Sequence, residues 1–327
     1  MRYLKRTKLK KIQNIYDAII GWGTGPIYKM NYKNYYYPMD FVIDGTGKMA
    51  GQKCKGIDIK NPDSLSHVSG KVLIVIYAIY ENEILNQLRS FDQGQIDVII
   101  YSLLDIELPN GCTIPEINGK GCEDILLVSL INQLNLETIR YLEVGVCHPI
   151  MRNNTFMLLE QYGNIKGYKG VLVEANPTCW SLIEEYREKD VLIKSGIVSA
   201  DNKENLKFFM FPHLLGHSTF SEKLAEEIIS KGYEHEELLI PVKTLNSVIE
   251  ENFEEAPDIL ALDAEGLDYE ILKSWNAEKY PFKIIISEIM EDAESDIESM
   301  MVDYGYRVYA RTLENIIWVN KEFELFV

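Results

Sequence analysis

Short apolar runs alternate with helix-periodic stretches along the first hundred residues. Four apolar runs predict strands at residues 18–21, 41–43, 72–77 and 98–101, and a stretch at 81–88 predicts a helix between the last two. Strands separated by helices are typical of a parallel sheet. The first part of the chain is therefore predicted to be a small Rossmann-like α/β domain.

The same alternation recurs over a longer stretch in the second part of the chain. Its apolar runs predict five strands, at residues 141–144, 171–174, 191–198, 259–262 and 284–288. Helix-periodic stretches include 123–134, 180–187 and 267–275. Residues 306–319 alternate apolar and polar positions, which is typical of an antiparallel hairpin. The pattern predicts an α/β fold with a doubly wound sheet and a C-terminal antiparallel hairpin.

A cluster of turn-forming residues separates these two parts. It consists of Pro109, Gly111, Pro115, Gly119 and Gly121. A chain of 327 residues is long enough for two domains at about 150 residues each. We therefore expect a small domain over 1–107, a linker over 108–124 and a larger domain over 125–327.

Composition and charge exclude several classes of protein. With 46% hydrophobic and 25% charged residues, the sequence is not that of a disordered, collagenous or coiled-coil protein. The net charge is −17, yet 15 basic and 14 acidic residues precede position 125, whereas 18 basic and 36 acidic residues follow it. An acidic second domain repels nucleic acid and anionic membranes, so we expect neither as a partner.

Cysteine usage and hydropathy predict a cytoplasmic protein. The five cysteines form no CxxC pair, so neither a disulfide framework nor a zinc knuckle is indicated. Six of the first eleven residues are basic, but no apolar signal core follows them. The longest apolar run, residues 72–80, is far shorter than the roughly 20 residues that span a bilayer. We therefore expect no stable membrane insertion.

The first two predicted strands of the larger domain end in acids that suit a nucleoside cofactor. Glu143 and Gly145 end the first, and Glu174 ends the second. A carboxylate at this position can accept hydrogen bonds from both ribose hydroxyls. The full GxGxxG fingerprint for a pyrophosphate is absent, which favours S-adenosylmethionine over NAD. The alternative is that these are ordinary strand-end carboxylates.

Three more acids follow the next strands. Asp263 and Glu265 come after the fourth strand, and Glu288 ends the fifth. Carboxyl ends of parallel strands face the ligand crevice, so these side chains should converge. Clustered carboxylates raise one another's pKa and can act as a general base, or they can hold Mg²⁺, Mn²⁺ or Ca²⁺. Glu265 has the alternative role of capping the helix that begins near residue 267.

Two histidines flank a probable turn sequence of the larger domain. His213 and His217 are spaced like zinc ligands on a helix, but Pro212 and Gly216 predict a loop, and no third ligand follows nearby. His217 is then a candidate acid, base or sugar hydrogen-bonding group on a substrate-facing loop. A solvated loop histidine is the alternative.

Glycines also mark the start of the small domain. Gly21, Gly23 and Gly25 follow its first strand, and glycine amides at such a turn can hold phosphate. A nucleotide or nucleotide-sugar site is one interpretation, and a domain kept for packing or for contacts in a homo-oligomer is the other. A nicotinamide-dependent sugar-nucleotide oxidoreductase would use the same glycines, but their spacing lacks the third glycine of the fingerprint.

From about residue 136 to its end the chain resembles the FkbM family of S-adenosylmethionine-dependent methyltransferases. The matching segments, in order, are RYLEVGVCHP (140–149), NNTF (153–156), GVLVEANP (170–177), VSADNKE (198–204), HSTFSE (217–222), VKTLNSVI (242–249), ILALDAEGLDYEIL (259–272), IISEI (285–289), GYRVY and ENIIWV. The chain departs from the family at Val146 and Cys147, where a branch of it has Ala-Asn, and at Glu143, where Asp is commoner. The small domain resembles those that precede bacterial sugar-modifying acyl- and methyltransferases.

The resemblance implies a class I methyltransferase fold and O-methylation of a sugar or another small hydroxyl compound, such as a nucleotide sugar in cell-surface polysaccharide biosynthesis. The implied cofactor-binding residues are Glu143, Gly145, His148, Asn154, Thr155, Glu174, Asn176, Ser199 and Asp263. Asp263 is the leading candidate for the base or a metal ligand, followed by Glu265, Glu288 and His217. A non-catalytic nucleotide-sugar binding protein and the oxidoreductase are the competing interpretations.

Overall fold

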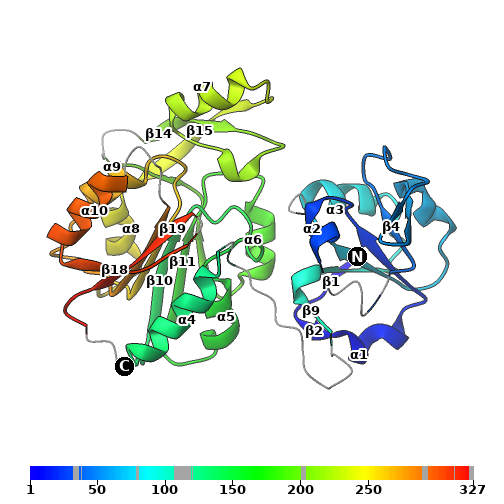
Figure 1. The fold of residues 1–327 in the computed structure, drawn as a ribbon, viewed down its shortest axis with the longest axis horizontal. Coiled ribbons are helices and arrows are strands. Elements are labelled where there is room, and N and C mark those ends of the chain that lie inside the picture. The colour runs from blue at the N-terminus through cyan, green and yellow to red at the C-terminus, as the bar shows by residue number, and fades with distance from the viewer. Residues whose placement is uncertain are drawn as a thin grey trace. The chain divides into compact units, whose positions relative to one another are not determined.

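The chain forms two compact units, Met1–Glu116 and Ile117–Val327 (Figure 1). The structure is a computed structural model that describes residues 1–31, 37, 39–78, 81–106, 119, 121–199, 204–288, 294–312 and 314–323. Most of the expected linker, residues 108–118 and 120, lies outside the described residues. None of the helices in the described ranges is long and apolar enough to cross a bilayer.

The first unit has a seven-stranded sheet in the order β1-β8-β7-β3-β4-β6-β5. Its strands are β1 (Arg2–Tyr3), β3 (Ala18–Trp22), β4 (Phe41–Ile43), β5 (Lys53–Cys54), β6 (Ile57–Lys60), β7 (Val72–Ile76) and β8 (Ile96–Ile100), with a separate pair, β2 (Thr7–Lys8) and β9 (Leu104–Asp105). Its helices are α1 (Leu9–Ile12), α2 (Pro26–Met30) and α3 (Glu81–Arg89). β7 and β8 are buried along their whole length, as the unbroken apolar runs of a parallel sheet require. Apart from the antiparallel pair of β5 and β6, the described strands of this sheet are parallel, as expected for a small Rossmann-like α/β fold.

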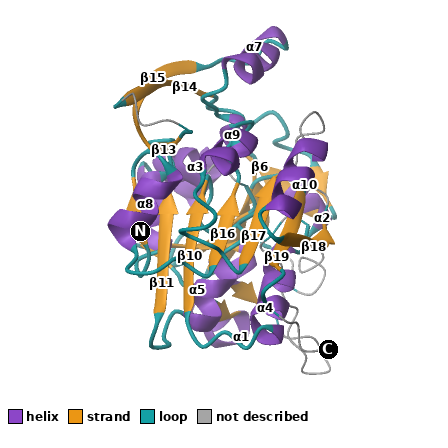
Figure 2. Cartoon of the chain, turned by 90° about the vertical axis from the view of Figure 1, so that its left-hand side faces the viewer, coloured by secondary structure: helices purple, strands orange, loops and turns teal. Residues whose placement is uncertain are grey.

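The second unit has a seven-stranded sheet in the order β12-β11-β10-β16-β17-β19-β18. Its strands are β10 (Ile139–Val144), β11 (Tyr168–Val173), β12 (Val191–Ile193), β16 (Ile259–Leu262), β17 (Ile284–Glu288), β18 (Tyr306–Arg311) and β19 (Asn315–Asn320). The first five are parallel, and β19 pairs antiparallel with both β17 and β18. The predicted doubly wound sheet with its C-terminal hairpin, the class I methyltransferase fold, is confirmed (Figure 2).

Two sets of helices cover the two faces of this sheet. One face packs on α8 (Leu245–Asn252), α9 (Asp268–Ser274) and α10 (Glu294–Asp303). The other face packs on α4 (Glu123–Gln133), α5 (Phe156–Tyr162) and α6 (Trp180–Tyr186) (Figure 1). Successive strand residues alternate between the two cores because side chains of a strand point to opposite faces.

An insertion between β12 and α8 departs from the expected pattern. Residues 191–198 do not form one strand: β12 ends at Ile193, and β13 (Gly196–Ile197) belongs to a second sheet with β14 (Asn205–Met210) and β15 (Glu236–Lys243). The insertion also carries α7 (Glu222–Ser230). Figure 2 shows β14, β15 and α7 beyond the carboxyl ends of the parallel strands. The insertion therefore reaches the edge of the sheet where parallel α/β folds bind their ligands.

Candidate active site

A cavity that is partly open to solvent lies at the carboxyl ends of β10, β11 and β16. The strand ends and the insertion together form its wall. The residues that line it are Val144, Gly145, Cys147, Val173, Glu174, Ala175, Asn176, Ser195, Gly196, Ile197, Phe208, Leu215, Gly216, Ser218, Thr219, Phe220, Asp263, Ala264 and Glu265. Its wall combines apolar side chains with a few polar groups, which is typical of a small-ligand site.

Gly145 brings two strand ends close together at the floor of the cavity. Its φ is +80°, in the region that favours glycine. A Cβ atom there would lie 1.8 Å from the carbonyl oxygen of Asp263. The amide of Asp263 donates to the carbonyl of Val144 at 3.0 Å. Any side chain at position 145 would therefore separate β10 from β16.

Glu174 is the best-anchored carboxylate on the cavity wall. Its side chain accepts from the amide of Cys147 at 2.7 Å and from that of Asn176 at 2.6 Å. Burial raises the pKa of Glu174, and these backbone donors oppose the rise. The carboxylate thereby ties the loop after β10 to the loop after β11. Cys147 and Asn176 line the cavity together with Glu174.

Three buried polar atoms at the site have no hydrogen-bond partner among the described residues. They are Nδ2 of Asn176, Oδ1 of Asp263 and Oε2 of Glu288. Asn176 is only 2% exposed, and its Oδ1 is already taken by the amide and hydroxyl of Thr178. Leaving a buried polar atom unpaired costs about 1–3 kcal/mol. Asn176 and Asp263 line the cavity, so a ligand bound there could pair with their free atoms.

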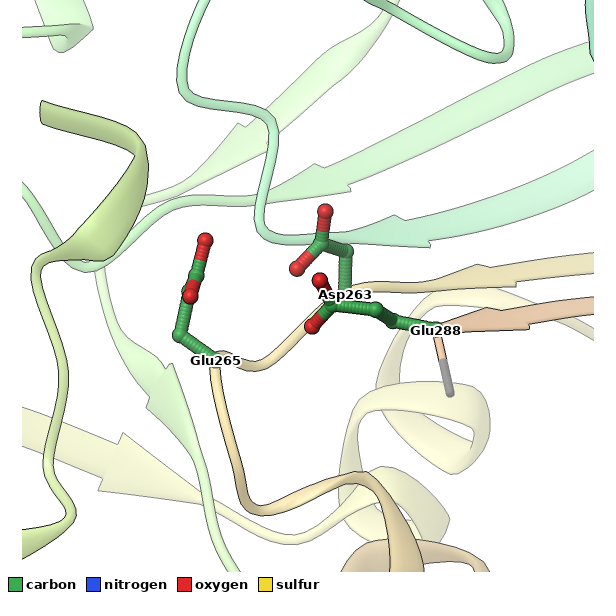
Figure 3. Close-up of side chains that lie close together, drawn as sticks. All are labelled: Asp263, Glu265 and Glu288. Atoms are coloured by element: carbon green, nitrogen blue, oxygen red, sulfur yellow. The ribbon is translucent and has the colours of Figure 1, made fainter. Parts of the chain in front are cut away.

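Asp263, Glu265 and Glu288 come together as the sequence predicts (Figure 3). One oxygen from each lies within 4.8 Å of the others. Burial and the neighbouring Glu288 raise the pKa of Asp263 well above its ordinary value. Burial and the neighbouring Glu265 raise the pKa of Glu288 to about 8. The cluster thus favours binding a proton or another cation near neutral pH.

Glu265 faces the cluster and does not cap the adjacent helix. The first residue of α9, Asp268, accepts from the amide of Ala264, in the loop before the helix, at 3.2 Å. No side chain caps α9 through its N-cap residue, Leu267. The alternative in which Glu265 caps this helix is therefore not what the structure has.

The insertion is attached to the cluster through Glu265. This residue has a φ of +47°, a strained value for a side chain with Cβ. The hydroxyl of Thr219, 1% exposed, donates to its carbonyl at 2.8 Å. His217 places Nδ1 3.6 Å from Oε2 of Glu265, on a largely exposed loop. The HSTF segment therefore brings a histidine to the carboxylates.

Other residues expected at the cofactor lie elsewhere. The two oxygens of Glu143, 3% exposed, accept from Asn153 at 2.9 Å and from Thr155 at 2.6 Å. His148 accepts the amides of Ile150 and Met151 within its own loop. None of the five expected residues Glu143, His148, Asn154, Thr155 and Ser199 lines the cavity.

Some wall residues were not foreseen from the sequence. Cys147 was noted only as a departure from the family, yet it lines the cavity with a φ of +51°. Phe208 and Phe220, with ring centroids 4.8 Å apart, contribute an aromatic pair from the insertion. The only sequence signal for Phe220 was its place in HSTF. Phe208 carried none, because its strand was not predicted.

The fold and this cavity define an α/β enzyme that binds a small ligand at the switch point of a doubly wound sheet. The profile of the methyltransferase FkbM domain matches residues 143–308, just over half of the chain. The protein belongs to the FkbM methyltransferase family and is a methyltransferase. S-adenosylmethionine is the usual cofactor of this family.

Solved structures with similarity to the chain have low identity and low TM-scores. A methyltransferase FkbM from Methylobacillus flagellatus KT is 9% identical, with a TM-score of 0.35 over 95% of this chain and 92% of its own. A precorrin-6y C5,15-methyltransferase from Geobacter metallireducens GS-15 is 10% identical, with a TM-score of 0.32 over 59% and 84%. Precorrin 8W decarboxylase from Methanobacterium thermoautotrophicum is 13% identical, with a TM-score of 0.30 over 66% and 96%. No curated protein matches significantly.

The raised pKa of Glu288 predicts a pH-dependent stability. Because its folded-state pKa is about 8, against an ordinary 4.5, the folded protein holds a proton that the unfolded chain releases. The free energy of unfolding should therefore fall as pH rises from about 4.5 to about 8. Glu288→Gln removes this loss. The Tm of the variant minus that of wild type should therefore increase as pH rises across that window, by roughly 2–4 °C for each kcal/mol of unfolding free energy that wild type loses.

Thermal denaturation of the ligand-free protein at several pH values measures this effect. Glu270→Gln, an exposed acid on α9, is the matched control and should follow wild type at every pH. A difference between Glu288→Gln and wild type that stays constant from pH 5 to pH 8 would contradict the prediction.

Proposed function

We propose that the protein transfers a methyl group from S-adenosylmethionine to a hydroxyl oxygen of a sugar or nucleotide sugar. One observation carries the proposal. An unpaired buried donor, Asn176 Nδ2, and an unpaired acceptor, Asp263 Oδ1, belong to the wall of one cavity, which also holds Glu174. The donor and Glu174 suit a ribose, and the acceptor suits a hydroxyl group to be deprotonated.

The residues present fit this cofactor. Glu174 offers carboxylate oxygens and Asn176 an amide donor to a ribose or adenine edge, and Gly145 leaves the floor of the cavity free of side chain. The aromatic pair of Phe208 and Phe220 adds an apolar surface for a base. S-adenosylmethionine, when bound, supplies a methyl group already activated by a sulfonium charge.

The chain's own groups then have to orient and deprotonate the acceptor. Asp263 is the proposed base, because its buried, raised-pKa carboxylate has an oxygen with no partner among the described residues. The proton passes from the acceptor hydroxyl to this oxygen. The adjacent carboxylates of Glu288 and Glu265 stabilise the proton gained by Asp263, and His217 beside Glu265 is a proposed route of that proton to solvent.

The acceptor is proposed to be neutral where it reacts. The described residues on the cavity wall include three carboxylates and neither lysine nor arginine, so a phosphate close to the cluster would be repelled. A polyhydroxylated sugar ring, with hydroxyls that donate to carboxylates, fits this wall. Any phosphates of a nucleotide sugar would have to lie away from the cluster.

A divalent cation is the second candidate role for the cluster. Asp263, Glu265 and Glu288 provide three hard oxygen donors, the type that Mg²⁺, Mn²⁺ and Ca²⁺ prefer. In that case the same carboxylates would orient the acceptor through the ion, and the proton would go to a different base. Activity in excess EDTA distinguishes the two roles.

For the small domain, packing explains one of the three glycines that suggested a nucleotide site. Gly23 has a φ of +109°, and a Cβ there would lie 3.0 Å from the carbonyl oxygen of Tyr77. The helix that follows, α2, has only five residues. A structural role therefore explains Gly23 without a phosphate, and nucleotide-sugar recruitment by this domain remains a secondary proposal.

Isothermal titration with S-adenosylhomocysteine and with NADH tests the proposed function. We expect saturable 1:1 binding of S-adenosylhomocysteine and no heat from NADH. Native mass spectrometry of the purified protein would additionally identify a carried-over cofactor or sugar nucleotide. Absence of S-adenosylhomocysteine binding would overturn the proposal, and binding of NADH in its place would favour the oxidoreductase.

A further inference from the structure

Arg187 is a buried cation that no sequence motif singled out. It follows α6 directly and is 2% exposed. Removing an arginine from water costs several kcal/mol unless its donors are paired. The interactions that offset this cost therefore show which part of the fold depends on it.

All five N–H groups of the guanidinium have acceptors. Nε donates to Asp190 Oδ2 at 2.7 Å. Nη1 donates to Asn153 Oδ1 at 3.1 Å and to the carbonyl of Pro149 at 3.3 Å. Nη2 donates to Thr155 Oγ1 and to Tyr141 Oη, both at 2.8 Å. The side chain of Asp190 is itself fully buried. Such a planar fork with five fixed acceptors is a geometry that lysine cannot reproduce.

Three of these acceptors belong to the β10–α5 loop, residues 145–155. They are Pro149, Asn153 and Thr155. Asn153 and Thr155 also donate to Glu143, whose carboxylate lies 3.6 Å from Nη1 of Arg187. The guanidinium therefore joins the loop to the end of the strand that precedes it.

The same loop carries two residues of the cavity wall. Gly145 lies against Asp263, and the amide of Cys147 donates to Glu174. A shift of the loop would therefore move the cavity floor and unpair Glu174. Arg187 does not line the cavity itself, so it can act on a ligand there only through the loop.

We infer that Arg187 is the positioning residue of the cofactor site: it holds the β10–α5 loop in the conformation that presents Gly145 and Cys147 to the cofactor. This inference rests on the proposed function. Glu143, Asn153 and Thr155 then belong to the same hydrogen-bonded network that holds the loop. The strand-end acid thus contributes to cofactor binding through the loop and not by direct contact.

A comparison of two arginines on the same unit tests the inference. Arg140, at the opposite end of β10, also pairs with a buried acid, Asp258, at 3.3 Å, but supports no cavity residue. We expect Arg187→Lys to raise the Kd of S-adenosylhomocysteine about tenfold, within the range for residues that act on a site through neighbours. Arg140→Lys should leave that Kd unchanged while also lowering the Tm.

Hydrogen exchange supplies the readout that a loss of stability alone would not give. Below the Tm of each variant, amide exchange in residues 146–152 should accelerate in Arg187→Lys and stay as in wild type in Arg140→Lys. Should the change at 187 prevent folding, Thr155→Val removes a single acceptor and a single donor of the network and is expected to give the same two effects.

The outcomes separate the two proposals. If wild type does not bind S-adenosylhomocysteine, the proposed function fails. If wild type binds it and Arg187→Lys binds it equally well, or Arg140→Lys weakens binding to the same extent, Arg187 has a purely structural role and the inference is overturned.

Discussion

Asp263→Asn is expected to lower the turnover number by about 10²–10⁴-fold, the usual contribution of a general base. The substitution keeps the size of the side chain but removes the charge that accepts the proton. The affinity for S-adenosylhomocysteine should stay near that of wild type, because the hydrogen bonds of Glu174 do not involve this residue. Steady-state assays at saturating donor, together with titration calorimetry, measure both quantities.

The pH dependence adds a second test of the same residue. Because the folded protein raises the pKa of Asp263 and of Glu288, the base is protonated at low pH, and activity should rise with pH through the neutral range. Full turnover in excess EDTA would support the role of Asp263 as a base and would exclude a metal from the mechanism. Loss of wild-type activity in EDTA, restored by Mg²⁺ or Mn²⁺, would instead assign the cluster to a metal. A wild-type kcat in Asp263→Asn would refute both roles.

Glu174→Ala should weaken binding of S-adenosylhomocysteine by about 10- to 150-fold, the equivalent of 1.5–3 kcal/mol for hydrogen bonds to a charged group. The loss has two sources. The acceptor for the ribose hydroxyls disappears, and the amides of Cys147 and Asn176 lose their partner. Isothermal titration at a temperature where the variant is folded provides the Kd.

Glu174→Gln and Asn176→Ala test the roles of these two side chains further. The glutamine keeps one acceptor oxygen and should bind more tightly than the alanine variant. Asn176→Ala removes a donor that has no partner among the described residues and also the acceptor of the Thr178 amide and hydroxyl, so it should both weaken binding and lower the Tm. Unchanged Kd values in both Glu174 variants would show that the cofactor lies elsewhere.

Much of the fold could be predicted because its strands are buried on both faces. Runs such as residues 72–77 and 284–288 are apolar at nearly every position, which in a short segment is typical of a parallel strand. The insertion could not be read in the same way. β14 and β15 pair across a connection that contains α7. In β15 the apolar residue Leu239 is exposed, so hydrophobicity along the strand does not follow burial, and no clear local pattern predicts it.

The site was predictable to the extent that strand ends determine it. Asp263, Glu265 and Glu288 follow neighbouring parallel strands, whose carboxyl ends meet at one edge of the sheet. Glu143 follows the same rule, yet the structure has it bonded to Asn153 and Thr155, away from the cavity wall. Strand position determines where a side chain begins but not which neighbour it meets.

The sequence by itself determined the class I methyltransferase fold, the family and the convergence of three carboxylates, since these follow from hydrophobic period, motif order and parallel strand direction. Only the tertiary structure decided that Thr219 and His217 reach Glu265, that Glu143 belongs to a buried network, and that Arg187 lies at its centre. His217 and Glu265 are 48 positions apart, Thr219 and Glu265 are 46 apart, and Arg187 and Glu143 are 44 apart. These contacts depend on packing between elements, which no local pattern encodes.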